Sequence, residues 1–324
     1  MDVFKEALRE IEIRHNKAKQ NLDARINFLQ NTLPGLREID KELADIGLGL
    51  AKIALGRGDD RSAEDLRRAS EDLGQARRRL LYENGYDESY FDEVFNCALC
   101  KDTGRADGAH CACLRQRVVA KYYEMSNLSQ ILDKENFDTF NVSYYSADID
   151  ENFGMSPREN IQRIWTASLK FVENFDTKFE NLLLHGSTGL GKTFLSNCIA
   201  KELLDRGKTV LYTTSAQLFK IVEEHRFGRK KAGPGYLDLI LDVDLLIIDD
   251  LGTEFPTVVT TSELFNFINT RLLSRKHTII STNLDPSDFE ENYSDRITSR
   301  LYGEYVAMRF FGDDIRISKK YRQT

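Results

Sequence analysis

The feature that most constrains this chain is the stretch GSTGLGKT, which runs from Gly186 to Thr193 and fits the pattern G-x-x-x-x-G-K-[ST]. It directly follows the apolar run NLLLH (181–185) and precedes a helical pattern, which is the context that this motif requires. In such a loop, glycines let backbone N–H groups turn inward, and the N-terminus of the helix adds its positive end. The stretch therefore predicts a site for the phosphates of a nucleotide; a coincidental glycine-rich turn is the alternative.

Two residues of this loop have predicted roles of their own. We expect the Lys192 ammonium to reach the β- and γ-phosphates and the Thr193 hydroxyl to coordinate magnesium. The expected nucleotide-binding residues of the loop are Gly186, Ser187, Thr188, Gly189, Leu190, Gly191, Lys192, Thr193 and Phe194.

A second apolar strand pattern, DLLIIDD (244–250), ends in two neighbouring carboxylates. We expect Asp249 to hold magnesium through water, and Asp250 to act as a base or to orient the attacking water. Asp250 is one methylene shorter than the Glu commonly found at such a place, so either hydrolysis is slow or Glu254 contributes to it. The alternative for the two acids is a solvated strand end.

A third strand pattern, HTIIST (277–282), is followed by Asn283. We expect the amide of Asn283 to orient the attacking water or to contact the γ-phosphate. An ordinary Asn turn before the sequence LDPSD is the alternative.

Two arginines follow in the sequence SDRITSRL. Arg296 and Arg300 are four residues apart and therefore share one helix face. They are candidates for stabilising transition-state charge at the phosphate of a neighbouring subunit. The alternative is that both are surface residues paired with Asp295 or Glu304.

From about residue 160 onward, short β-rich runs alternate with helical stretches. This alternation is typical of an α/β fold with a parallel sheet that helices cover on both faces. We therefore predict a P-loop domain over residues 161–324. The predicted strands are residues 181–185, 209–214, 244–249, 277–282 and 304–310.

Residues 1–90 have helical patterns throughout, which predict an α-helical, coiled-coil-like arm. Breaks at LPGL (33–36) and GRGDD (56–60) give two or three long helices in an antiparallel hairpin or bundle. Two apolar seams step by three and four residues. One runs from Leu36 to Ile53, and the other consists of Leu66, Ala69, Leu73, Ala76 and Leu80. Either these seams pack on each other, or this region docks a partner protein.

Cysteine spacing predicts a small zinc-binding module over residues 91–120, followed by a connector over residues 121–160. A C-x-x-C pair and a C-x-C pair, with the turn-forming residues KDTGRADG between them, are able to close a tetrahedron of thiolates around zinc. All four positions are then filled, so the zinc is expected to be structural. There are two alternatives to a zinc site of four thiolates: a disulfide between two of the cysteines, or His110 as a ligand in place of one thiolate. The predicted ligands are Cys97, Cys100, Cys111 and Cys113.

A cationic segment, EEHRFGRKKAGPGYLDL (223–239), lies between a helical stretch and the acidic strand. With Phe227 and Tyr236 for stacking, its cations are able to follow the backbone of single-stranded DNA. A solvated, glycine-rich loop is the alternative. The candidate DNA-binding residues are Arg226, Arg229, Lys230 and Lys231.

The composition is that of an ordinary soluble protein, with 41% hydrophobic and 30% charged residues. A net charge of −7 gives no global sign of nucleic-acid binding, although a local patch can still provide it. No run approaches the roughly 18 apolar residues that cross a bilayer, and the N-terminus does not read as a secretory signal. Five cysteines, of which Cys198 is isolated and reads as a core residue, favour a reducing compartment. We expect a cytoplasmic protein.

The phosphate loop, LLIIDDLGTE, STN, DRITSRL and FFGDDIR together resemble the AAA+ ATPases of the DnaC/DnaI type, the bacterial replicative helicase loaders. The transposition helper ATPase IstB is related to that group. The resemblance covers residues from about 130 to 320, and CALCKDTGRADGAHCACL resembles the zinc-bearing N-terminal region of the DnaI-like branch. It implies a five-stranded sheet, ATP and Mg²⁺ at the phosphate loop, and subunits that lie side by side with arginines crossing the interface.

The same resemblance assigns residues by their place in the motifs. Asp249 and Asp250 match the metal-binding and catalytic acids, and Asn283 matches the sensor. Arg300 matches the arginine finger, with Arg296 as its companion. A late arginine proposed to sense nucleotide corresponds to Arg316, and no separate lid domain is expected after it.

The function implied by the resemblance is ATP-dependent loading of the replicative helicase onto single-stranded DNA, in replication initiation or restart. Expected partners are the hexameric helicase, single-stranded DNA and further copies of this chain through the AAA+ domain, but no membrane. Expected cofactors are ATP, Mg²⁺ and Zn²⁺, with slow hydrolysis that DNA or a partner stimulates. The alternatives are an IstB-like transposition helper and an adaptor that binds nucleotide with little hydrolysis.

Overall fold

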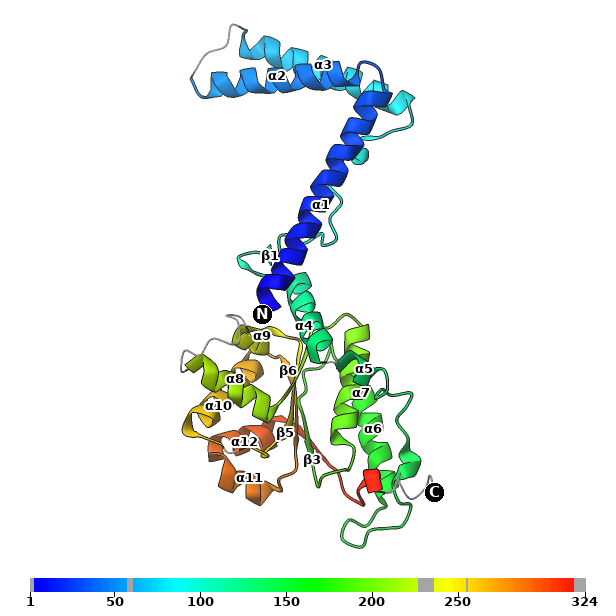
Figure 1. Ribbon diagram of the computed structural model, residues 1–324, viewed down its shortest axis with the longest axis vertical. Helices are drawn as coiled ribbons and strands as arrows, with labels where there is room; N and C mark the ends of the chain where they lie inside the picture. Colours follow the sequence, from blue (N-terminus) through cyan, green and yellow to red (C-terminus); the bar gives the residue numbers. More distant parts are fainter. Residues whose placement is uncertain (1–2, 57–60, 127, 227–235, 255, 318–324) are drawn as a thin grey trace. The chain divides into compact units, whose positions relative to one another are not determined.

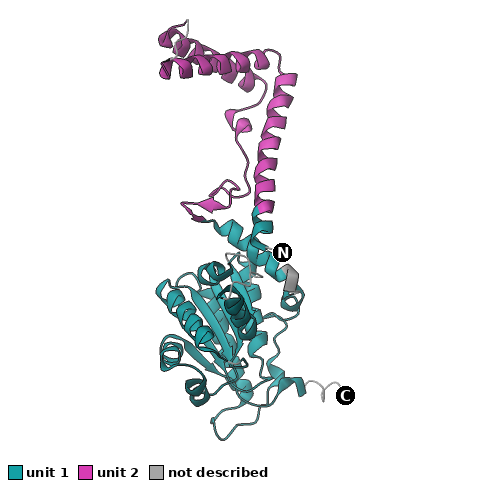
Figure 2. Cartoon of the chain, turned by 60° about the vertical axis from the view of Figure 1, so that its left-hand side comes forward, with its two compact units in different colours: residues 1–8, 110–324 teal, residues 9–109 magenta. Residues whose placement is uncertain are grey.

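The computed structural model describes residues 3–56, 61–126, 128–226, 236–254 and 256–317. Contacts between residues divide the chain into two compact units, drawn in separate colours in Figure 2. One unit is residues 9–109, and the other is residues 1–8 together with residues 110–324. Within the ranges described, no helix is long and apolar enough to cross a membrane.

The unit of residues 9–109 is mainly helical, as predicted. It contains most of α1 (Val3–Thr32), then α2 (Leu36–Ala54), α3 (Ala63–Glu83) and the 3-10 helix η1 (Glu88–Phe91). At the first predicted break, Gly35 precedes α2 with a left-handed φ of 86°, which glycine adopts without strain. Residues 57–60 of the second break lie outside the described residues.

The two seams pack on each other, with one correction. Helices α2 and α3 form a hairpin (Figure 1), and Leu36 and Leu81 belong to a buried cluster with Leu29 and Leu33 of the α1 end. Ala76, however, is exposed. At 3.6 residues per turn, position 76 is about 80° around the helix from Leu66, whereas position 77 is only about 20° away.

Arg77 therefore occupies the place predicted for Ala76. Its guanidinium donates to Asp40 at 2.8 Å and lies 4.1 Å from the centre of the Phe91 ring. The seam of α3 thus contains a half-buried ion pair, after which Leu80 and Leu81 make apolar contacts in the buried cluster.

A short hairpin of β1 (Arg105–Ala106) and β2 (Ala109–His110) separates the two predicted cysteine pairs. The chain then continues into α4 (Ala112–Ser126). This hairpin is the turn-forming element expected from the sequence KDTGRADG.

The larger unit contains the predicted parallel sheet. Its strands are β3 (Leu182–His185), β4 (Val210–Thr214), β5 (Leu245–Leu251), β6 (His277–Thr282) and β7 (Val306–Arg309). They pair in the order β4-β5-β6-β3-β7, and all neighbours are parallel. All five predicted strands are present, so the α/β class with a five-stranded parallel sheet is confirmed.

Helices cover both faces of this sheet, with α6 and α7 on one face and α8, α10 and α12 on the other (Figure 1). Every residue of β3 and β6 is buried, as a doubly covered sheet requires. The remaining elements of this unit, in chain order, are α5 (Leu128–Leu132), η2 (Val142–Tyr144), α6 (Pro157–Glu173), α7 (Lys192–Asp205), α8 (Ser215–Arg226), α9 (Tyr236–Asp242), α10 (Val258–Leu273), α11 (Pro286–Asn292) and α12 (Asp295–Glu304).

The strand order decides which loops meet. Strand β6 lies between β3 and β5. Because the three strands are parallel, the phosphate loop after β3, the acids at the end of β5 and Asn283 after β6 all leave the sheet at one edge. This edge carries the candidate site.

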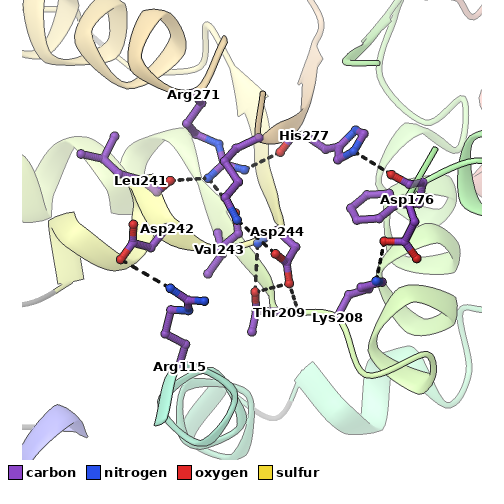
Figure 3. A network of polar contacts seen from close by, with 12 residues as sticks. Arg115, Asp176, Lys208, Thr209, Leu241, Asp242, Val243, Asp244, Arg271 and His277 are labelled. Carbon is purple, nitrogen blue, oxygen red and sulfur yellow. Dashed lines mark hydrogen bonds and ion pairs between the residues drawn. The ribbon is translucent and has the colours of Figure 1, made fainter. Parts of the chain in front are cut away.

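At the other ends of β5 and β6, a fully buried arginine ties the elements together. The guanidinium of Arg271 donates hydrogen bonds to the carbonyl oxygens of Ile240 (2.7 Å), Val243 (3.0 Å) and His277 (2.5 Å) (Figure 3). Burial lowers the pKa of this guanidinium to about 10, so it stays charged at neutral pH. The residue joins α10 to the end of α9 and to the start of β6.

Candidate nucleotide-binding site

The phosphate loop has the backbone that its glycines predict. Gly191 adopts a left-handed φ of 92° and is the N-cap of α7, which begins at Lys192. At Gly186, a Cβ atom would lie 2.1 Å from the carbonyl oxygen of Phe310, so only glycine fits there. The loop therefore ends on the N-terminus of α7, where free backbone N–H groups favour anions.

Lys192 is buried at the centre of this loop. Its Nζ atom donates to the carbonyl oxygens of Gly186 (2.6 Å) and Ser187 (2.7 Å) and to Oδ1 of Asn283 (2.7 Å). Burial lowers the pKa of the ammonium to about 8, while Asp250 and Asp249 act in the opposite direction. The structure thus brings together the predicted phosphate lysine and the predicted sensor amide.

Asp249 is buried beside the start of α7. Its Oδ2 atom accepts hydrogen bonds from the Thr193 hydroxyl at 2.9 Å and from the Tyr212 hydroxyl at 2.5 Å. The Ser281 hydroxyl donates to Oδ1. The hydroxyl and carboxylate oxygens of Thr193 and Asp249 are adjacent and are ligands of the kind that Mg²⁺ prefers, so the pair fits a magnesium site.

Asp250 has the left-handed φ of 56° that is uncommon for a residue with a Cβ atom, and it lies at an irregularity in the pairing of β5 with β6. Its backbone N–H donates to the Ser281 hydroxyl at 2.9 Å. Burial, and then the neighbouring Asp249 carboxylate, raise the pKa of Asp250. A raised pKa makes a carboxylate a better proton acceptor.

Glu254 is engaged elsewhere. Its carboxylate accepts hydrogen bonds from the hydroxyls of Ser215 and Tyr293 and from the N–H of Gly252, at 3.2 Å. It is not part of the wall of the cavity that Asp250 lines. The Ser215 hydroxyl is also 2.9 Å from the carbonyl oxygen of Asp250, so Glu254 is linked to the backbone of Asp250 but not to the cavity.

Lys192, Asp250 and Asn283 line a cavity of about 710 Å³, which is of the size that small-molecule ligands occupy in proteins; Asp249 does not line it. The predicted loop residues Thr188 to Thr193 line it, with Phe194, Asp250, Asn283 and Arg316. Another part of the wall comes from the segment predicted only as a connector, through Glu135, Thr139, Phe140, Asn141, Tyr144 and Tyr145.

The connector is held against the loop by one buried tyrosine. The Tyr145 hydroxyl donates to the carbonyl oxygen of Leu190 at 2.9 Å. It also lies so close to Gly191 that a Cβ atom there would be 2.6 Å away. The aromatic residues in ENFDTFNVSYYS were a signal for this wall, because apolar rings are what a nucleoside pocket is built from.

The stretch after β7 approaches the same loop. The Ile315 N–H donates to the carbonyl oxygen of Gly189 at 3.0 Å, and the Asp314 carboxylate lies directly beside Gly189. Arg316 is exposed, lines the cavity and is 3.8 Å from Asp314. The connector before α6 and the stretch after β7 thus both contribute to one cavity.

A family model described as IstB-like ATP binding protein matches residues 112–302, which is more than half of the chain. The chain belongs to the IstB-like ATP-binding protein family. The matched residues include the phosphate loop, Asp249, Asp250, Asn283 and both arginines of α12.

Two curated proteins that are similar to this chain are 26% and 32% identical to it over the matched residues. The replicative helicase loader DnaC of Escherichia coli strain K12 is 26% identical over 132 residues, 41% of this chain and 54% of that protein. The chromosomal replication initiator protein DnaA of Jannaschia sp. strain CCS1 is 32% identical over 140 residues, 42% of this chain and 28% of that protein. The chain spans about half or less of the length of these curated relatives.

Two solved structures are also similar. The crystal structure of the DnaC helicase loader is 20% identical, covers 56% of this chain and 99% of that chain, and has a TM-score of 0.47. The crystal structure of the DnaI is 21% identical, covers 56% of this chain and 94% of that chain, and has a TM-score of 0.45.

The two arginines of α12 in this IstB-like protein are not among the residues that line the cavity. Arg296 is exposed and forms no ion pair with the residues described, whereas Arg300 is 3.7 Å from Glu304. Pairing with Glu304 was the alternative expected for Arg300. Both side chains are on the outside of the unit, so neither touches the phosphate loop of its own chain.

Of the candidate DNA-binding residues, only Arg226 lies within the described ranges. It is the last residue of α8 and is 3.4 Å from Glu263 of α10. Arg229, Lys230 and Lys231 lie outside the described residues.

The four predicted zinc ligands of the segment 97–113 lie together: the Sγ atoms of Cys97, Cys100, Cys111 and Cys113 are all within 4.8 Å of one another. Sulfur atoms bound tetrahedrally to zinc are about 3.8 Å apart, given Zn–S bonds of about 2.3 Å, so the four thiols fit that ion. Local hydrogen bonds shape the first pair, from the Lys101 N–H to the Cys97 carbonyl (2.8 Å) and from the Thr103 N–H to the Cys100 carbonyl (3.0 Å). The side chain of His110 does not belong to this cluster of four thiols.

Proposed function

We propose that this chain is an ATPase that loads a replicative DNA helicase onto single-stranded DNA. The observation that supports this most is the meeting of three strand ends around one cavity, with Lys192 on Asn283 and Thr193 on Asp249. Membership of an ATP-binding family supports the nucleotide, and the similarity to the relative named replicative helicase loader DnaC supports the process.

In this proposal, residues 186–194 hold the phosphates of ATP, with Lys192 at the β- and γ-phosphates. Thr193 and Asp249, whose side-chain oxygens are 2.9 Å apart, hold Mg²⁺. When bound, Mg²⁺ neutralises charge that develops on the phosphates. The hydroxyls of Tyr212 and Ser281 fix the orientation of Asp249 for this task.

Asp250 is the proposed base, because it lines the cavity and burial raises its pKa. Asn283 contacts Lys192 and orients the attacking water or the γ-phosphate. Glu254 has no part in this step, since its carboxylate is bound by Ser215 and Tyr293. An aspartate in this place is consistent with slow hydrolysis that DNA or a partner stimulates.

The connector is proposed to bind the nucleoside. Phe140, Tyr144 and Tyr145 line the cavity together with the phosphate loop, and Phe140 is in edge contact with Phe194 at 5.6 Å between ring centres. Aromatic and apolar walls of this kind favour a flat base. We propose that Arg316, which also lines the cavity, senses the nucleotide.

The arginines of α12 are the basis on which we propose an oligomer. Arg296 is exposed, Arg300 is half-buried and neither lines the cavity of its own chain, so we propose that they act on ATP held by a neighbouring copy through the AAA+ domain. The ion pair of Arg300 with Glu304 is solvent-exposed and is therefore easily exchanged for a phosphate.

The remaining parts are proposed to bind macromolecules. The helical arm would bind the hexameric helicase, and Cys97, Cys100, Cys111 and Cys113 would hold a structural zinc. The segment with Arg226, Arg229, Lys230 and Lys231 would bind single-stranded DNA. We propose residues 1–90, 91–120, 121–160 and 161–324 as the arm, the zinc module, the connector and the ATPase domain. A cytoplasmic location is proposed with this function.

Two other functions remain as alternatives. The name of the family, IstB-like ATP binding protein, favours a helper ATPase of a transposase as the second candidate. Asp250 in place of a longer Glu favours a nucleotide-binding adaptor with little turnover as the third.

ATP turnover with and without single-stranded DNA tests the enzyme. We expect DNA to raise the rate, Lys192→Ala to abolish it with loss of binding, and Asp250→Asn to abolish it while ATP still binds. Asp138→Asn is a matched control, because Asp138 is exposed and is not part of the cavity wall. ATP bound without turnover by the unchanged chain would favour the adaptor.

Co-purification tests the partner. Retention of the cell's replicative helicase on the full chain supports the loader. Retention of a transposase, and no binding of the helicase, would contradict it in favour of the transposition helper.

A further inference from the structure

A carboxylate lies in the cavity wall where the phosphate chemistry needs none. Glu135 follows α5 and lines the cavity with Phe140 and Phe194. Its backbone N–H donates to the carbonyl oxygen of Ile131 at 2.8 Å, and the Asn136 amide closes the same turn onto the carbonyl oxygen of Asp133 at 2.9 Å. Local hydrogen bonds therefore hold the backbone that carries this carboxylate.

The Glu135 side chain is anchored by α7. The Asn197 amide donates to Oε2 of Glu135 at 2.6 Å, and Asn197 is only 2% exposed. Because α7 begins at Lys192, the anchor lies five residues further on, or about 7.5 Å along the helix axis at a rise of about 1.5 Å per residue. One helix thus sets the separation between the phosphate lysine and the carboxylate.

Glu135 has no counter-ion in the part of the chain that the structure describes. Its hydrogen-bond partner Asn197 is a neutral amide. Among the described residues, no Lys or Arg forms an ion pair with Glu135, and none donates a hydrogen bond to its Oε1 atom. Such a carboxylate repels phosphate but is well satisfied by a neutral donor. In a cavity that takes a nucleoside triphosphate, it therefore suits the nucleoside end of the ligand.

We propose that Glu135 is a specificity-determining residue that accepts a hydrogen bond from the nucleoside of the bound nucleotide, and that Asn197 is its positioning residue. This inference rests on the proposed function, since it needs a nucleotide in this cavity. ATP offers two kinds of donor, the exocyclic amino group of adenine and the ribose hydroxyls. Guanine has an acceptor oxygen where adenine has the amino group, and 2′-deoxy-ATP lacks one hydroxyl.

The test compares the affinities of the full chain for ATP, GTP and 2′-deoxy-ATP, each with Mg²⁺, before and after Glu135→Gln. The substitution keeps the shape of the side chain and removes its charge. If Glu135 binds the amino group, the preference for ATP over GTP falls by about tenfold or more, because the new amide is able to donate to guanine. If it binds the ribose, the preference for ATP over 2′-deoxy-ATP falls instead.

Two further variants separate specificity from folding. Asn197→Ala keeps the carboxylate but removes its anchor, so we expect the same ratio to fall by a smaller factor. Asp138→Asn, an exposed acid three residues further on, should leave both ratios within about twofold. A general loss of stability would weaken all three nucleotides equally and would not move either ratio.

Both ratios unchanged in Glu135→Gln, with ATP still bound, would overturn this inference and leave the proposed function intact. A wild-type chain that binds none of the three nucleotides would overturn the proposed function, and this inference with it.

Discussion

The Nζ atom of Lys192 lies 2.7 Å from Oδ1 of Asn283, a residue 91 positions further along the chain. This contact joins the phosphate loop after β3 to the end of β6. Burial and Asp249 raise the pKa of Asp250, and a hydrogen bond from Asn283 acts against that rise. One amide therefore links the proposed phosphate ligand to the proposed base.

Replacing this amide should separate turnover from binding. We expect Asn283→Ala to lower the rate of ATP hydrolysis by about 10- to 100-fold, because an oriented polar group at the reacting phosphate is lost. The Kd for ATP should change by less than about fivefold, since the loop and Lys192 remain. Asn292→Ala, at an exposed position on α11, is the control. Equal rates for both variants would contradict the role of Asn283.

The pKa of Lys192 predicts a proton uptake on binding. Burial lowers it from 10.5 to about 8, so the nucleotide-free protein loses this proton as the pH rises through about 8. Phosphates favour the charged ammonium, so ATP binding above that pH takes up a proton and weakens as the pH rises further. Calorimetry in two buffers of different ionisation enthalpy measures the uptake.

Lys192→Arg is the matched variant, because arginine stays charged throughout this range. We expect this variant to bind ATP more weakly than the wild type and without proton uptake. The same uptake in both proteins would mean that another group takes up the proton.

The same lysine affects stability. In the unfolded chain Lys192 keeps its proton up to about pH 10.5, whereas in the folded chain it loses the proton at about pH 8. The lysine therefore makes the free energy of unfolding increase with pH between about 8 and 10.5.

Tyr212 should tune the magnesium dependence. Its hydroxyl donates to Asp249 at 2.5 Å, so Tyr212→Phe removes an orienting hydrogen bond from the proposed metal ligand. We expect the Mg²⁺ concentration for half-maximal ATP hydrolysis to rise by about 10-fold or more. Tyr302→Phe removes a hydroxyl that has no hydrogen-bond partner in the described part of the chain and should leave this concentration unchanged. If the half-maximal Mg²⁺ concentration does not change in Tyr212→Phe, the Tyr212 hydroxyl is not needed to orient Asp249.

Zinc content tests the cysteine cluster. We expect one zinc per chain by atomic absorption, loss of this zinc in Cys100→Ala, and its retention in Cys198→Ala, because Cys198 lies in the core of α7. Removal of the metal by a chelator should unfold the segment 97–113, since structural zinc contributes folding energy to such modules. Zinc retained in full by Cys100→Ala would point to another set of ligands.

Arg271 should be among the most destabilising positions to change. Arg271→Met leaves buried carbonyl oxygens of Ile240, Val243 and His277 without their donor, and we expect a loss of about 3 kcal/mol or more in the free energy of unfolding. Arg163→Met, on the exposed face of α6, should cost less than about 1 kcal/mol. Denaturant titration measures both, and similar losses would show that the buried bonds contribute little.

Much of the site was predictable because its signals are local. The phosphate loop needs glycines and a lysine at fixed spacing, and the apolar runs before Gly186, Asp249 and Asn283 predict three buried strands. Parallel strands carry such residues to one edge, so their meeting followed from the fold class. The wrong prediction that Ala76 belongs to the seam of α3 also has a local cause, because positions spaced by three and four residues move gradually around a helix. The packed hairpin shows that Arg77 occupies the seam position instead.

The chain's own residues thus determined the α/β class, the loop and its ammonium, because backbone preferences and glycine conformations act over a few neighbouring positions. The tertiary structure alone decided that Tyr212 and Ser281 hold Asp249, that Tyr145 closes on Leu190, and that Glu135 enters the cavity on Asn197. Those contacts join residues 32 to 62 positions apart. The packing of strands and helices determines which of these residues meet, and that packing depends on the whole core rather than on any short stretch of sequence.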